Sequence, residues 1–171
     1  DPRKEDLSAG RSINLALSHR GIKALKSVGV FDQVEPQLIP MKGRMIHHEN
    51  GKLDFQPYSI NPEEYINSVS RGELNKILMS AAENSGKVTI YFDHLLIEVN
   101  NDELNFVSGK TIPNEGIIFG ADGVGSELRK YIDTSTDFPS RTEPLGHAYK
   151  ELNIAPSDVG KFQIDANSLH I

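Results

Sequence analysis

The sequence predicts a mixed α/β (α+β) fold in which helices and short strands alternate along one chain. Three observations support this class: two segments with helical periodicity and capping residues, a hairpin signal between two extended runs, and an apolar run that leads through a glycine-rich turn into another helix. A chain of 171 residues is long enough for one domain. Because only 37% of the residues are hydrophobic, we expect a folded unit of modest stability.

Two helices are expected in the first half of the chain. One covers residues 18–28, with Ser18 as its N-cap. The other begins at a capping box formed by Ser70 and Glu73 and ends at Gly86. In both segments the apolar residues recur at the i, i+3, i+4 spacing that places them on one helical face.

Extended segments are expected between and after these helices. Residues 41–58 contain two extended runs around Asn50-Gly51, a dipeptide that readily takes the positive φ angles of a two-residue type I′ hairpin turn. A short helix is predicted from Ser126 to about residue 132. Further strands are predicted at residues 88–92, 95–99, 104–107, 116–120 (as a buried strand), 147–154, 161–164 and 168–171.

Composition excludes several classes of function. The net charge of −6 and the absence of a basic run argue against nucleic acid or an anionic membrane surface as the main partner. Without cysteine there are no disulfides, catalytic thiolates or cysteine metal sites. No apolar stretch approaches the ~18 residues of a membrane span, and a cytoplasmic location is predicted. The alternative is that the chain is part of a longer protein that reaches a membrane through a further C-terminal segment.

The run with the clearest chemical meaning is GADGVGSELR at residues 120–129, because it follows an apolar run and opens a helix. Its glycines let a ligand approach the backbone, and Asp122 can accept hydrogen bonds from sugar hydroxyls. The N–H groups at a helix start can bind phosphate. The run therefore predicts a dinucleotide site; an ordinary strand-to-helix corner capped by Ser126 is the alternative.

Several stretches together resemble the kynurenine 3-monooxygenases, which are FAD-dependent aromatic hydroxylases. They are RSINLALSHRG at residues 11–21, IPMKGRMIH at 39–47, SVSRGELNK at 68–76, GADG at 120–123 and LHI at 169–171. The resemblance covers essentially the whole chain. It implies part of an FAD-binding domain at residues 1–38 and 68–135, and part of an antiparallel substrate sheet at 39–67 and 140–171.

The resemblance also implies a reaction and the residues that serve it. The reaction is hydroxylation of L-kynurenine to 3-hydroxykynurenine with FAD, NADPH and O2, and no catalytic side chain is assigned because the flavin carries the chemistry. Arg44 and Tyr58 would hold the substrate carboxylate, a role that suits a planar guanidinium. The residues expected to contact FAD are Ala16, Arg71, Leu96, Asp122, Glu127 (through its backbone N–H) and Arg11.

The two substrate residues present a geometric difficulty. A two-residue turn at Asn50-Gly51 would pair Arg44 with Pro57 and Gly43 with Tyr58, which points Arg44 and Tyr58 to opposite faces. Pro57 cannot donate to the ladder and Gly43 tolerates a bulge. We therefore expect regular pairing to fail there, and Tyr58 to turn back toward Arg44.

No metal site is predicted. His47 and His48 are neighbours that a strand would point to opposite faces, and no third ligand stands at a useful spacing. His94, His147 and His170 are interpreted as isolated. Two other functions stay open: a related FAD-dependent hydroxylase of another aromatic acid, and a non-catalytic nucleotide-binding module.

The chain itself is interpreted as an internal piece of a longer protein, because it begins with Asp1 and its last residues resemble a strand cut in mid-course. The family has a glycine-rich phosphate-binding turn before the segment that the chain resembles. We therefore expect the 171 residues alone to bind FAD weakly or not at all and to lack hydroxylase turnover.

Overall fold

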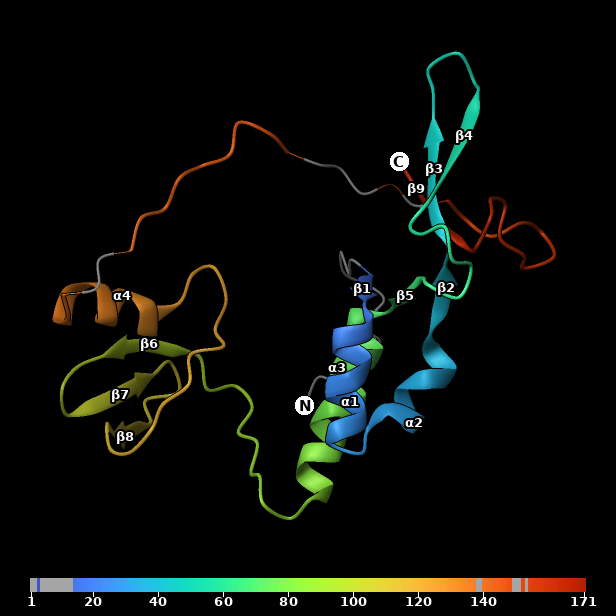
Figure 1. Ribbon diagram of the computed structural model, residues 1–171. Helices are drawn as coiled ribbons and strands as arrows, with labels where there is room; N and C mark the ends of the chain where they lie inside the picture. The colour runs from blue at the N-terminus through green and yellow to red at the C-terminus, as the bar shows by residue number, and fades with distance from the viewer. Residues whose placement is uncertain (1–2, 4–13, 138–139, 149–151, 153) are drawn as a thin grey trace. The chain divides into compact units, whose positions relative to one another are not determined.

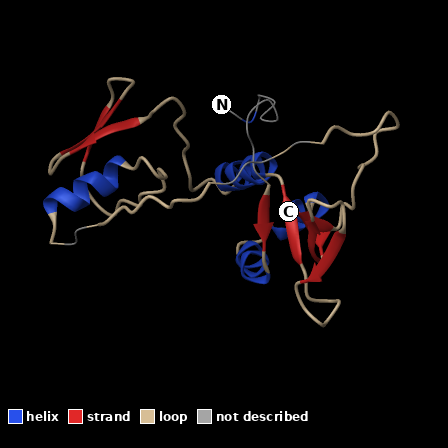
Figure 2. Ribbon diagram, turned by 90° about the horizontal axis from the view of Figure 1, so that it is seen from above, coloured by secondary structure: helices blue, strands red, loops and turns tan. Residues whose placement is uncertain are grey.

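The computed structural model describes residue 3 and residues 14–137, 140–148, 152 and 154–171 (Figure 1). The chain divides into two compact units, one formed by Asp1–Ile90 with Lys150–Ile171 and the other by Tyr91–Tyr149. Figure 2 distinguishes the helices from the strands of each unit. Among the described residues, no helix combines the length and the apolar character that a membrane span requires.

The first unit holds most of the regular structure. Its elements are β1 (Leu15–Leu17), α1 (His19–Ser27), α2 (Phe31–Val34), the 3-10 helix η3 (Glu35–Gln37), β2 (Ile39–Met41), β3 (Gly43–His47), β4 (Leu53–Pro57), β5 (Ile66–Val69), α3 (Arg71–Asn84) and β9 (Ser168–His170). Strands β1 and β2 both pair antiparallel with β5, which lies between them. The two predicted helices are confirmed as α1 and α3, whereas α2 and η3 were not predicted.

A hydrophobic core joins these helices to the β1-β5-β2 sheet. Its buried members are Leu25, Val30, Val34, Val69 and Leu74. At the start of α3, the Ser70 hydroxyl accepts a hydrogen bond from the backbone N–H of Glu73 at 3.4 Å, as the capping box predicts. Ser18 precedes α1 at the predicted position, but its side chain makes no capping bond. The same unit therefore contains both the strongest local signals and the best-buried side chains.

A second sheet in this unit has the order β4-β3-β9, with β3 antiparallel to β4 and parallel to β9. The predicted hairpin is confirmed, but the two-residue type I′ turn is wrong. The carbonyl of His48 accepts from Gly51 N at 2.8 Å, and His48 N donates to Lys52 O at 3.0 Å. Gly51 has a positive φ of 81° and Asn50 does not, which gives a three-residue loop in which Asn50 Oδ1 accepts from Lys52 N.

The second unit is a small antiparallel sheet with one helix. Its elements are β6 (Leu96–Val99), β7 (Glu103–Phe106), β8 (Thr111–Pro113) and α4 (Glu127–Ser135). The strand order is β6-β7-β8, with an irregularity in β6 between Leu96 and Glu98, and α4 lies against β6. Strands β6 and β7 and the helix that follows Ser126 are confirmed predictions, and β8 was not predicted.

Three predicted strands are wrong: those at 88–92, 116–120 and 161–164. The strand predicted at 147–154 includes residues 149–151 and 153, which lie outside the described residues. The run at 116–120 was expected to be buried, yet Ile117 is 86% and Phe119 88% exposed. An apolar run becomes a strand only where a neighbouring segment pairs with it, and none of the described segments does so here. By contrast, the predicted strand at 168–171 forms as β9, because β3 provides its partner.

Candidate functional site: an arginine on the β4-β3-β9 sheet and a capped helix start

Arg44 and Tyr58 converge on one face of the β3–β4 hairpin. Because the loop is one residue longer than a type I′ turn, Arg44 pairs with Gln56 rather than with Pro57. Tyr58 is then a diagonal neighbour of Arg44 on the same face. The guanidinium carbon of Arg44 lies 5.8 Å from the centroid of the Tyr58 ring.

The route to this convergence differs from the predicted one. Pairing does not fail at Gly43, which stays in register opposite Pro57, and Tyr58 N continues the ladder by donating to Lys42 O at 3.0 Å. The prediction of a bulge was therefore wrong, and loop length alone brings the two side chains together. A one-residue change of register moves every side chain of a strand to the other face.

The surroundings of Arg44 hold its strand in place. A Cβ atom added at Gly43 would lie 2.7 Å from the Phe55 ring and would also collide with the Gln56 carbonyl oxygen. The Phe55 ring therefore closely covers this glycine. On the other side, Leu169 of β9 stands opposite Arg44. In the described part of the chain, the guanidinium is exposed and has no ion pair. A free guanidinium on a fixed strand suits the binding of a carboxylate.

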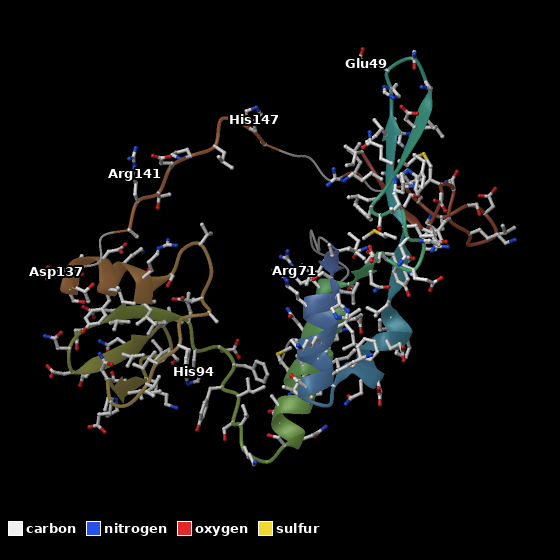
Figure 3. The ribbon with its side chains drawn as sticks, in the orientation of Figure 1. Glu49, Arg71, His94, Asp137, Arg141 and His147 are labelled. Atoms are coloured by element: carbon white, nitrogen blue, oxygen red, sulfur yellow. The ribbon has the colours of Figure 1, made fainter. Side chains whose placement is uncertain are left out.

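Ala16 and Arg71 lie in the first unit, away from its core. Ala16 pairs with Ser68 and alternates with Leu15 and Leu17, which pack on the core, so Ala16 points to the opposite face of the sheet. Arg71 is the first residue of α3 and is exposed, at the end of the helix nearest β5 (Figure 3). A cation is unfavourable at a helix N-terminus, so Arg71 is available to an anion.

Leu96, Asp122 and Glu127 lie in the second unit, where Asp122 itself caps α4. Its Oδ2 accepts from Glu127 N at 3.0 Å and from Leu128 N at 3.5 Å. A hydrogen bond from the Ser126 hydroxyl is the main cause that lowers the pKa of Asp122, and the backbone N–H groups lower it further. The N–H of Glu127, which was predicted to contact the cofactor, is thus already bonded within the chain.

Two further contacts complete this helix start. The Ser126 hydroxyl accepts from Arg129 N at 3.0 Å, as the sequence predicted for an N-cap. The side chain of Glu127 bonds to Lys130 Nζ at 2.6 Å, so its carboxylate is directed along the helix. Leu96, at the start of β6, pairs with Phe106. The pattern had indicated the capped helix, but no sequence signal showed that Asp122 would occupy its first N–H groups.

The chain matches no family model, but it is similar to curated proteins along all of its length. It is 41% identical to the kynurenine 3-monooxygenase of Myxococcus xanthus, 40% identical to that of Stenotrophomonas maltophilia and 37% identical to that of Sus scrofa. The chain is related to the kynurenine 3-monooxygenases. It spans 37% to 39% of the length of these three relatives.

Two solved structures are similar in fold to this chain. One is P. aeruginosa PqsL in complex with 2-aminobenzoylacetate, with a TM-score of 0.57 and 21% identity over 78% of this chain and 39% of that one. The other is 2-methyl-3-hydroxypyridine-5-carboxylic acid oxygenase, with a TM-score of 0.57 and 20% identity over 76% of this chain and 34% of that one. The predicted mixed α/β fold class is confirmed, and both solved structures share the fold of this chain.

The remaining predicted residues divide into two groups. Arg11 lies outside the described residues. Among the histidines, the interpretation of His170 as isolated is wrong, because its imidazole is hydrogen-bonded to that of His47. The ring of His94 packs against those of Tyr91 and Phe106. Within the part of the chain that the structure covers, no cluster of three or more histidine, aspartate and glutamate side chains is arranged to hold a metal ion.

Proposed function

We propose that the protein to which this chain belongs is a flavoprotein monooxygenase that hydroxylates L-kynurenine to 3-hydroxykynurenine, with FAD, NADPH and O2. The observation that carries the proposal is similarity to kynurenine 3-monooxygenases over the whole chain, at 41% identity in one relative. Because the chain spans 38% of that relative, the activity is proposed for the whole protein.

Arg44 and Tyr58 are proposed to bind the carboxylate of the substrate. The hairpin register places both side chains on one face, and β4 and β9 flank the strand that carries Arg44. A guanidinium can bind a carboxylate through two parallel N–H···O bonds, and the Tyr58 hydroxyl can donate a third. This arrangement supports recognition of an acid whose reacting ring extends away from the sheet.

The FAD contacts are proposed for both units. Arg71 offers an exposed cation, and Ala16 leaves the backbone of β1 accessible on the face away from the core. A carboxylate accepts up to about four hydrogen bonds, so Asp122 can bind a ribityl or sugar hydroxyl while it caps α4. The backbone N–H of Glu127 would have to donate to both Asp122 and the cofactor. The FAD contacts proposed for Leu96 and Arg11 rest on the resemblance alone.

The chemistry that FAD supplies when bound is the reductive activation of O2 for transfer to the aromatic ring. The side chains of this chain bind and orient, and none is proposed as an acid or base. Division into an FAD-binding part at residues 1–38 and 68–135 and a substrate part at 39–67 and 140–171 also remains a proposal. The compact units of the structure, which group residues by proximity, follow different boundaries.

The test is NADPH oxidation and product formation by the full-length protein with kynurenine, and separately with 4-hydroxybenzoate. We expect kynurenine to stimulate oxidation and yield 3-hydroxykynurenine. Arg44→Met should raise KM for kynurenine by about 100-fold, the effect of removing a charge-assisted bond of 2–3 kcal/mol. The matched control is Lys52→Met, which removes a cation from the same hairpin. The ammonium of Lys52 lies 3.5 Å from the Asp54 carboxylate.

Three outcomes would contradict the proposal. Preference for 4-hydroxybenzoate would indicate a related hydroxylase of another acid. Nucleotide binding without substrate-stimulated electron transfer would indicate a non-catalytic module. An equal KM in Arg44→Met and Lys52→Met would remove Arg44 from the substrate site even if kynurenine is hydroxylated.

A further inference from the structure

Two histidines far apart in the sequence bridge β3 and β9. His47 Nε2 lies 2.8 Å from His170 Nδ1, across 123 positions of sequence, and the ring centroids are 5.1 Å apart. The other ring nitrogen of His170, Nε2, lies 2.8 Å from the carbonyl oxygen of Asp165. We call His47, His170 and this carbonyl the histidine clasp.

The protons of the clasp can be assigned from its acceptors. A carbonyl oxygen only accepts, so His170 Nε2 must carry a hydrogen. In the neutral pair, His47 Nε2–H then donates to His170 Nδ1. With one added proton the hydrogen bond persists, because one ring stays neutral and can accept: His47 donates from Nε2 if His47 is charged, and His170 donates from Nδ1 if His170 is charged. With two added protons, two N–H groups and two positive charges face each other across 2.8 Å, and the bond cannot form.

Few other charges face the clasp. By strand alternation and register, His47 and His170 share their sheet face with the apolar residues Met45, Leu53 and Phe55. Strand β2, which packs against β9, has no charged residue. The charged groups of the sheet that alternate to the opposite face are Lys42, Arg44, His48, Lys52 and Asp54, of which His48 and Lys52 both lie 3.5 Å from Asp54.

The carboxylate that faces the clasp is that of Asp165, together with the terminal carboxylate of Ile171 when the chain is studied as 171 residues. The Ser168 hydroxyl is the main cause that lowers the pKa of Asp165, followed by Asn167 N–H, and the charge of His170 lowers it as well. Asp165 therefore stays anionic at neutral pH.

The clasp lies beside the backbone bonds that dock β9. His47 N donates to Ile171 O at 2.8 Å, and Ile171 N donates to Met45 O at 3.0 Å. The same ladder sets Leu169 opposite Arg44. We propose that His47 and His170 are positioning residues whose shared hydrogen bond fixes β9 beside Arg44, and that a second proton on the pair releases β9. The consequence for substrate rests on the proposed function, whereas the docking of β9 does not.

Hydrogen exchange of the full 171-residue chain tests the docking. Protection factors, corrected for intrinsic exchange, are measured for the amides of His47 and Ile171 between pH 8 and pH 5. We expect a loss of tenfold or more toward pH 5 in the wild type. Amides that pair β3 with β4, such as that of Gln56 opposite Arg44, should keep their protection and report that the hairpin stays folded.

Variants decide between the clasp and general acid loosening. His170→Gln and His47→Gln should lower the protection of Ile171 at pH 8 and abolish the pH step, while His48→Gln should retain both. Wild-type protection that does not change with pH, or a step that persists in His170→Gln, overturns the proposal.

The full-length protein tests the consequence for Arg44. When the pH is lowered from 7.5 to 5.5, KM for kynurenine should rise more in the wild type than in His170→Gln. The change in kcat should be equal in both proteins. A pH step in exchange with identical KM profiles overturns the positioning role. Absence of kynurenine turnover at every pH contradicts the proposed function instead, and leaves the exchange result to stand by itself.

Discussion

The two units differ in how fully their most apolar segments are buried. In the first unit, Val34 is fully buried and Val69 is 2% exposed between the helices and the β1-β5-β2 sheet. In the second unit, Leu104 and Leu128 are each 9% exposed, while Phe119, in the most apolar run of that unit, is 88% exposed. An apolar run therefore predicts burial correctly where nearby helices supply the side chains that cover it. The same prediction fails where the run would have to pair with a strand distant in the sequence.

The largest effect is expected from Leu74→Ala in the core of the first unit. Leu74 is 9% exposed in the core cluster, and its truncation should lower the free energy of unfolding by about 3 kcal/mol. The measurement is urea unfolding followed by far-UV circular dichroism, with α3 amide exchange to assign the transition to this unit. Leu78→Ala, on the same helix at 37% exposure, is the control and should cost less than about 1 kcal/mol. Equal losses would contradict this account of the core.

A smaller effect is expected from Gly43→Ala in the hairpin of the same unit. The new Cβ would collide with the Phe55 ring and the Gln56 carbonyl, and the backbone of β4 must move. Overpacking of this kind should cost about 2 kcal/mol and weaken protection of the β3–β4 amides. Gly146→Ala in the second unit, where nothing lies within 4 Å of the added atom, is the control. Unchanged β3–β4 exchange would show that the hairpin absorbs the methyl group.

The sequence predicted elements whose signals are local. The Ser70 cap, the Ser126 cap and the extended runs on either side of Asn50-Gly51 each lie within a few residues of what they specify, and each forms. Register is different, because Gly51 alone takes the positive φ and one additional loop residue moves Arg44 to the face of Tyr58. Dipeptide preference favours a turn type but does not fix loop length.

Contacts between distant segments could not be read from the sequence. His170 finds His47 only because β9 pairs parallel with β3, and no periodicity in either segment specifies that pairing. The pattern at residues 120–129 likewise indicated an acid beside a helix start. It could not distinguish an Asp122 free for a ligand from one that accepts Glu127 N–H. Both chemistries are compatible with the same spacing.

Within the second unit, a weak pH dependence is expected at the start of α4. Because hydrogen bonds lower the folded-state pKa of Asp122, its stabilising effect is complete above the unfolded value of 3.8 and is lost as pH falls through the lower folded value. Amide exchange of Glu127 and Leu128 should therefore accelerate, relative to intrinsic exchange, only below about pH 4. Asp122→Asn should abolish this change, and Asp137→Asn, just after the helix, should retain it (Figure 3). The same acid response in Asp122→Asn would assign it to another group.

The smallest effect is expected from Phe119→Ser, which tests the other side of the comparison. A phenylalanine that stays 88% exposed contributes little apolar burial, so its loss should change the free energy of unfolding of the 171-residue chain by less than about 0.5 kcal/mol. Leu104→Ala in β7, at 9% exposure, is the matched control and should cost about 2–3 kcal/mol on the same urea transition. If Phe119→Ser costs as much as Leu104→Ala, residues 116–120 pack in solution, and the contrast between the two units disappears. If only Leu104→Ala is costly, the run is an apolar segment that no described segment covers, and the buried strand predicted from its composition requires a pairing that the described residues do not supply.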